Sequence, residues 1–192
     1  MARRIFATTI PGCQNFVADY DNVTQGLLHI VVRHYRQFQK VIPTLAAVMQ
    51  RLPLELSEAV TAATFARLED VNDRLSDVAT LLKDDKASIK ALMEAQKLVA
   101  AYFDSIMTPK CYQKKSTTKS GKLQKVFDVK MENTDAKLIV GVSKEARNPR
   151  IITAYFQVLK KPTLIPVISC PPPAKRTASG WETVTKRKRN AY

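Results

Sequence analysis

Residues 68–106, LEDVNDRLSDVATLLKDDKASIKALMEAQKLVAAYFDSI, carry the strongest fold signal in this chain. Apolar residues recur there every seven positions in two interleaved registers, and ten of the twelve positions are apolar. A stripe spaced alternately by three and four residues is typical of a coiled coil or of a bundle seam. The two registers are Leu68, Leu75, Leu82, Ile89, Gln96, Phe103 and Val71, Val78, Asp85, Leu92, Val99, Ile106.

This stripe has two interpretations. A straight helix would drift by roughly 120° from a seven-residue repeat over six heptads, so a stripe that stays in register favours supercoiled self-association. That interpretation predicts a homo-oligomer held together through the heptad positions from Leu68 to Ile106. The segment Lys83-Asp84-Asp85-Lys86 interrupts the stripe, however, and Asp85 or Ser88 is suited to cap a new helix. An intrachain hairpin of two helices is therefore the alternative, and the pattern alone leaves both open.

Helical signals also dominate the part of the chain before this stretch. Asn22 and Gln25 have the spacing of a capping box, and the apolar residues between Leu27 and Val41 follow helical spacing. Pro43 predicts the end of that helix, and a short helix over residues 44–51 is expected before Pro53. We predict a mainly helical region over residues 1–108.

Pro109 is expected to end the helical region. Residues 109–122 predict a basic polar loop. Residues 123–159 predict three strands of a small antiparallel sheet, with a hairpin at 143–150, covered on one face by the helices. Residues 160–192 are rich in proline and basic residues, so a disordered tail is expected there. The fold class is therefore α+β.

Charge is distributed unevenly along the chain. The formal net charge is +14, and residues 109–192 carry nineteen basic and five acidic side chains. Residues 55–108, in contrast, carry six basic and ten acidic side chains. A basic end of this kind suits a polyanionic partner such as RNA or DNA. The candidate nucleic-acid-binding residues in the basic loop are Lys110, Lys114, Lys115, Lys119 and Lys122, with Tyr112 as a base-stacking residue.

Two basic clusters occur in the tail. Lys175 and Arg176 are followed by nine residues and then by Lys186, Arg187, Lys188 and Arg189. This spacing resembles a bipartite nuclear localisation signal. The resemblance implies that the two clusters occupy acidic, tryptophan-lined grooves of a nuclear import receptor, with the protein in the nucleus and cytoplasm.

One segment carries a second resemblance. The apolar run Lys137–Val142 and the later run Arg150–Phe156 are similar to the last hairpin of small ribonuclease toxins of the barnase, colicin and RelE-like group. That resemblance implies RNA cleavage with Arg150 and Thr153 at active-site positions. Neither histidine lies in the predicted sheet, since His29 and His34 belong to the first predicted helix. A histidine could act there only if long-range folding brought it to the sheet.

Other signals narrow the class of protein. Cys13, Cys111 and Cys170 are far apart and form no CxxC pair, so we expect free thiols in a reducing compartment and no metal site. No nucleotide, metalloprotease or hydrolase motif is present, so no cofactor is expected. No run approaches the roughly 18–20 apolar residues of a membrane span, and the start lacks the apolar run of a signal peptide.

The combined pattern predicts a non-enzymatic, nucleus-directed, oligomeric nucleic-acid-binding protein. A compact chain with such a tail would suit an accessory or replication-associated protein encoded by a virus of a eukaryotic host. The alternatives are a ribonuclease toxin, or an interaction scaffold whose heptad seam binds another protein and whose tail is an import address.

Overall fold

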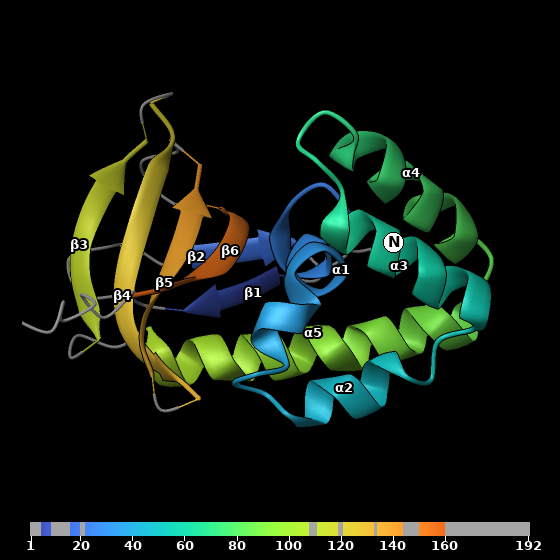
Figure 1. The fold of residues 1–192 in the computed structure, drawn as a ribbon, viewed down its shortest axis with the longest axis horizontal. Coiled ribbons are helices and arrows are strands. Elements are labelled where there is room, and N and C mark those ends of the chain that lie inside the picture. Colours follow the sequence, from blue (N-terminus) through green and yellow to red (C-terminus); the bar gives the residue numbers. More distant parts are fainter. Residues whose placement is uncertain are drawn as a thin grey trace, which may run out of the picture. The chain divides into compact units, whose positions relative to one another are not determined.

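The computed structural model describes residues 5–8, 16–19, 22–107, 111–118, 121–132, 134–143 and 150–159. For residues 5–8, 16–19 and 112–115 it describes the backbone alone. These parts form five helices and two antiparallel sheets, so the predicted α+β class is confirmed. They all belong to one unit, residues 1–159, and helix α1 lies between the larger sheet and helix α3 (Figure 1).

Prolines separate the first three helices, as predicted. Pro43 is the N-cap residue of α2 and Pro53 that of α3. The start of α1 differs from the prediction, because its N-cap is Gln25 and no side chain caps it. The Asn22 side chain instead accepts hydrogen bonds from the backbone amide (2.8 Å) and the hydroxyl (2.7 Å) of Thr24. The helices are α1 Gly26–Phe38, α2 Thr44–Met49, α3 Leu54–Phe65, α4 Val71–Leu82 and α5 Lys86–Ile106.

The heptad stripe is broken at Asp85. This residue is the N-cap of α5, and its carboxylate accepts hydrogen bonds from the backbone amides of Ala87 and Ser88, each at 3.0 Å. Of the two interpretations that the sequence left open, one continuous helix over residues 68–106 is therefore wrong, and a new helix start at Asp85 is confirmed. The two helices do not pack chiefly on each other, however. Helix α4 packs mainly on α3, whereas α5 packs on α1 and α2.

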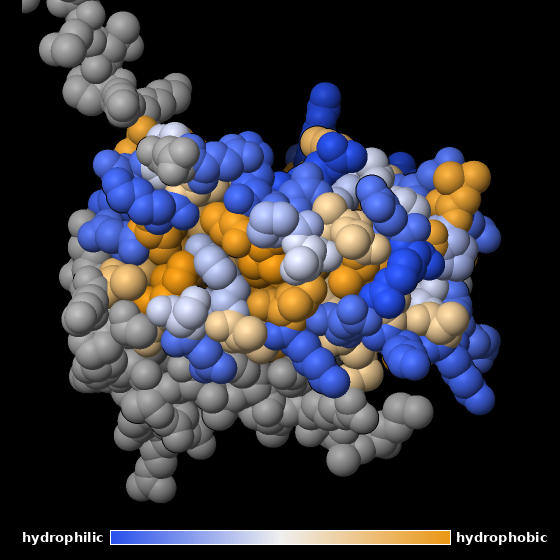
Figure 2. Space-filling view, turned by 90° about the horizontal axis from the view of Figure 1, so that it is seen from below, coloured by the Kyte–Doolittle hydropathy of each residue, from blue (hydrophilic) through white to orange (hydrophobic). Residues whose placement is uncertain are grey.

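Most heptad positions are buried in the core of the chain itself. Leu68, at the start of the stripe, is 86% exposed and lies in the loop before α4. The buried members are Leu75, Val78, Leu82, Leu92, Gln96, Val99 and Phe103. Because these side chains are already packed within one chain, the stripe does not offer a continuous seam to a second copy. Figure 2 shows apolar patches that remain visible among polar side chains on the face seen from below.

The N-terminal segment contains an element that the sequence analysis did not predict. Strand β1, Ile5–Thr8, pairs antiparallel with strand β2, Phe16–Asp19. The prediction of a helical region over residues 1–108 is therefore wrong for these two strands.

The larger sheet has four antiparallel strands in the order β3-β4-β5-β6. The three predicted strands are confirmed. Residues 112–117, which were predicted to be loop, form a fourth strand, so that prediction was wrong. The connection at 144–149, Lys110, Lys119 and the tail from residue 160 lie outside the described residues. The strands are β3 Tyr112–Thr117, β4 Leu123–Met131, β5 Thr134–Val142 and β6 Ile151–Val158.

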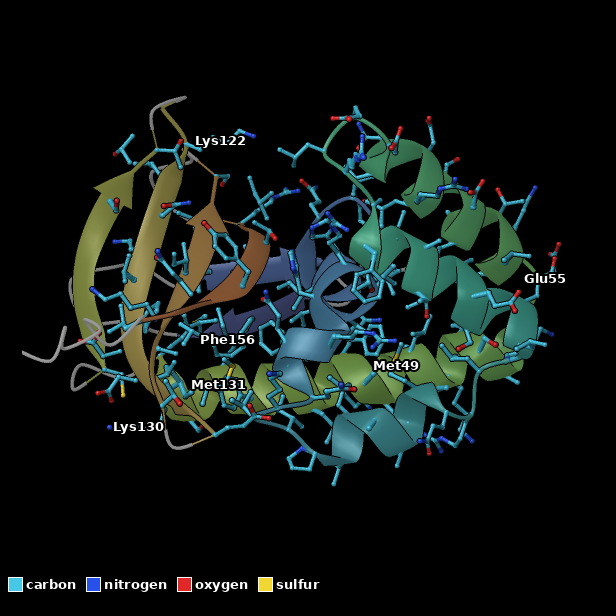
Figure 3. The ribbon with its side chains drawn as sticks, viewed as in Figure 1. Met49, Glu55, Lys122, Lys130, Met131 and Phe156 are labelled. Carbon is cyan, nitrogen blue, oxygen red and sulfur yellow. The ribbon has the colours of Figure 1, made fainter. Side chains whose placement is uncertain are left out.

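Helix α1 joins the helices to the outer strand β6. The ring centroid of Phe38, in α1, lies 4.9 Å from that of Phe156 in β6 and 5.8 Å from that of Phe103 in α5. Phe156 lies between the sheet and the helices (Figure 3). The backbone amide of Phe156 donates a hydrogen bond to Oε1 of Gln37 at 3.0 Å. Because an outer strand leaves alternate amides without a strand partner, this side chain satisfies one of them.

Candidate functional site

One row of polar residues crosses the four-stranded sheet. Ser116, Gln124, Gly141 and Thr153 follow one another as register partners on β3, β4, β5 and β6. Cross-strand partners share a face of a sheet, so these four residues, called the polar row below, lie on one face. Leu138 and its partners alternate with them and belong to the core. The polar row therefore lies on the face turned away from the helical core.

The neighbouring row on the same face is apolar and aromatic. It runs from Lys114 through Val126 and Ile139 to Tyr155. Val126 and Ile139 are only 5% and 8% exposed, whereas Tyr155 is half-buried. The Tyr155 hydroxyl accepts a hydrogen bond from Nε2 of Gln124 at 3.4 Å, which links this row to the polar row.

A histidine of α1 reaches the end of the polar row. His34 Nε2 lies 3.2 Å from Oγ1 of Thr153, and the His34 ring centroid lies 6.2 Å from that of Tyr155. The two residues in the hydrogen bond are 119 positions apart in the sequence. Packing of α1 along β6 brings them together, and no local pattern around His34 indicates this contact.

Burial keeps both histidines neutral near pH 7. Desolvation lowers the pKa of His34 to about 3, and repulsion from His29 and Arg33 adds to this effect. Desolvation also lowers the pKa of His29, although a hydrogen bond to the Val23 carbonyl opposes the shift. Since that carbonyl can only accept, Nδ1 of His29 carries the proton and donates it at 3.0 Å. With so low a pKa, His34 is a weak base for proton abstraction but can still hold the Thr153 hydroxyl in place.

Gly141 allows the close packing of Thr153. A Cβ atom at position 141 would meet Cγ2 of Thr153 at 3.1 Å, closer than nearly all ordinary contacts. The methyl group of Thr153 therefore lies against the space that a side chain would need. Any larger residue at position 141 would displace Thr153 relative to His34.

Lysines are concentrated on β3, on β4 and in the connection between them. Residues 112–131 contain six lysines and one acidic residue, Asp128. Lys115 and Lys125 are register partners in the row of Val140 and Ala154, which faces the helical core, and Lys125 is only 9% exposed. Lys122 is exposed just before β4, and Figure 3 shows it at the opposite end of that strand from Lys130.

The other predicted site residues lie in different parts of the chain. Lys114, Lys115 and Tyr112 belong to β3, and not to a loop. Arg150 directly precedes β6 and lies three positions before Thr153 in the sequence. Its backbone amide donates a hydrogen bond to Oγ of Ser143 at 2.9 Å. The import-signal residues 175–189 lie outside the described residues.

The described residues lack two features, a metal-binding cluster and a membrane-spanning helix. Among them, no group of three or more His, Cys, Asp or Glu side chains is arranged to hold a metal ion. None of the helices in the described part of the chain combines the length and apolar character needed to cross a membrane.

The sequence analysis missed Gln124, Tyr155 and His34 as site residues. The available signal was weak: Thr153 and Tyr155 are two residues apart on a predicted strand and so share a face. Comparison of the chain with protein-family models, with curated proteins and with solved structures finds no match.

Proposed function

We propose that this protein binds nucleic acid, with strands β3 and β4 as a phosphate-contacting surface. The observation that carries the proposal is the charge of this hairpin: residues 112–131 contain six lysines and one acidic side chain, and Lys122 and Lys130 are exposed. Lysine contacts to phosphate supply most sequence-independent affinity for nucleic acid.

The contrast with the helical part supports this assignment. Residues 22–107 carry ten basic and ten acidic side chains, so the five helices are neutral as a group. Helix α4 and the residues beside it are acidic, with Asp70, Asp73, Asp77 and Asp84 in close succession. A polyanion would be repelled there and attracted to the sheet, so the charge distribution selects the sheet as the contact surface.

The first prediction concerns the salt dependence of binding. We expect affinity for a fluorescent oligonucleotide to fall steeply with salt concentration. Lys122→Glu should weaken binding at each salt concentration and should reduce the slope of log affinity against log salt by about the value of one phosphate contact. Lys90→Glu is the matched control, because Lys90 is also exposed and has the same charge but lies on α5. Equal weakening by the two variants would show that only total charge matters and would remove β3 and β4 as the site.

The basic tail is the second part of the proposal. Its two clusters, Lys175-Arg176 and Lys186–Arg189, have the spacing of a nuclear import address and also add positive charge. In the same salt series, a chain ending at residue 173 should bind less tightly than the full chain. Fused to a fluorescent protein in eukaryotic cells, it should also lose nuclear accumulation. Unchanged localisation of the shortened chain would refute the import role while leaving the sheet proposal intact.

The contact between His34 and Thr153 favours one second function, cleavage of RNA. This contact places a histidine beside the sheet, whereas the sequence showed no histidine in the predicted strands. The low pKa of His34 makes it a weak base. Under this function, the purified protein shortens a single-stranded RNA during incubation, and Thr153→Ala and Arg150→Ala abolish the shortening. Gel analysis of end-labelled RNA decides the question, because RNA left intact by the unmodified protein excludes cleavage.

A further inference from the structure

We infer that the sheet face around Tyr155 binds an unpaired base, so that the protein prefers single-stranded nucleic acid to duplex. This inference rests on the proposed function and adds the class of nucleic acid to it. A base in a duplex is stacked on its neighbours and hides its faces, whereas a single strand can offer a base to an aromatic side chain. Tyr155 is half-buried on the face turned away from the helical core.

Tyr155 is held in place by several contacts. Its hydroxyl accepts a hydrogen bond from Gln124, and its ring lies beside the ring of His34, tilted by 35°. The next residue, Phe156, is anchored through its backbone to Gln37 of α1. A ring already fixed by neighbours loses little conformational freedom when a base stacks on it, so more of the stacking energy contributes to affinity.

Polar groups suited to a base edge lie next to this ring. The polar row places the Gln124 amide and the hydroxyls of Ser116 and Thr153 on the same face. Amide and hydroxyl groups both donate and accept, as the edges of unpaired bases require. None of these three side chains carries a charge, so they suit base contact, whereas the lysines suit phosphate contact.

Phosphate contact and base contact can be made by one strand of nucleic acid. Lys114 belongs to the same row as Tyr155 and lies three strands away across the sheet. At 4.7–4.9 Å between neighbouring strands, this separation is roughly 14 Å. A single strand a few nucleotides long spans such a distance, with its backbone toward β3 and a base toward β6.

A different role for Tyr155 is also consistent with part of this geometry. Tyr155 is the register partner of Ile139, and its ring could simply cover the apolar pair Ile139 and Val126. A covering role predicts that loss of the ring changes stability and leaves the preference for single strands unaltered. A stacking role predicts that the preference itself disappears.

The test compares a fluorescent single strand with a duplex of the same sequence at one salt concentration. We expect Tyr155→Leu to weaken single-strand binding by about ten-fold and to leave duplex binding unchanged. Tyr155→Phe, which keeps the ring, should retain the preference. Equal binding of single strand and duplex by the unmodified protein, or equal weakening of both by Tyr155→Leu, would overturn the inference. No binding of either would instead count against the proposed function.

A second measurement covers the case in which Tyr155→Leu fails to fold. The chain contains one tryptophan, Trp181, so the double variant Tyr155→Trp, Trp181→Phe has its only tryptophan at position 155. Stacking of a base should quench the emission of that residue with single strands and not with duplex. An emission unchanged by saturating single strand would overturn the stacking contact independently of the leucine variant.

Discussion

Phe38→Ala is expected to lower the free energy of unfolding by about 4 kcal/mol, as large-to-small substitutions of buried aromatic residues do. Phe38 has no exposed surface. Its ring contacts rings from two other elements, Phe103 of α5 and Phe156 of β6, in edge-to-face geometry. Alanine would lose the transfer free energy of the ring and leave a cavity at the point where helices and sheet meet.

Urea denaturation followed by circular dichroism measures this loss. The matched control is Phe65→Ala, the same chemical change on a ring that is 67% exposed and lies 5.0 Å from the guanidinium carbon of Arg36. We expect that control to cost at most about 1 kcal/mol, the scale of an exposed cation–π contact. Similar losses in the two variants would mean that Phe38 does not hold helices and sheet together.

The helical boundaries show what local sequence can establish. Pro43, Pro53 and the Asp85 cap act through the backbone within a few residues; the two proline boundaries were predicted, and Asp85 was one of two caps that the sequence left open. The heptad stripe was misleading because both helices are short. Drift from a seven-residue repeat is only about 20° per heptad, so twelve residues in α4 and twenty-one in α5 cannot separate a coiled coil from an ordinary bundle.

Strand β3 shows where local sequence fails. Its residues, YQKKST, have the charge and polarity of a loop. Outer strands commonly carry lysines, because such residues prevent unwanted pairing with other chains. Only pairing with β4 makes this segment a strand, and that pairing is a property of the hairpin and not of the six residues.

The candidate site depends still more on long-range structure. Thr153 was named from the sequence, but its partner His34 lies 119 residues earlier, on a helix that packs against the outer strand. Gln124 and Tyr155 join the site through the registers of β4, β5 and β6. Residue types can suggest chemistry on each strand, whereas only the pairing of strands determines which residues share a face.

Lowering the pH from 7 to 4 is expected to destabilise the protein by about 3 kcal/mol through His34 alone. Burial lowers the pKa of this histidine from 6.5 to about 3. Below pH 6.5 the unfolded chain therefore binds a proton that the folded chain does not. The stability contributed by neutral His34 is complete above pH 6.5 and decreases as the pH falls toward 3, with each pKa unit equivalent to about 1.4 kcal/mol.

His34→Gln tests this prediction, because glutamine can still hydrogen-bond to Thr153 but does not titrate. We expect the urea midpoint of the unmodified protein to fall steeply between pH 6.5 and 4 and that of the variant to fall much less. A smaller slope should remain, since the lowered pKa of His29 acts in the same direction. Parallel curves for the two proteins would show that His34 is charged or exposed in the folded state. The contact with Thr153 would then no longer support a fixed hydroxyl at the end of the polar row.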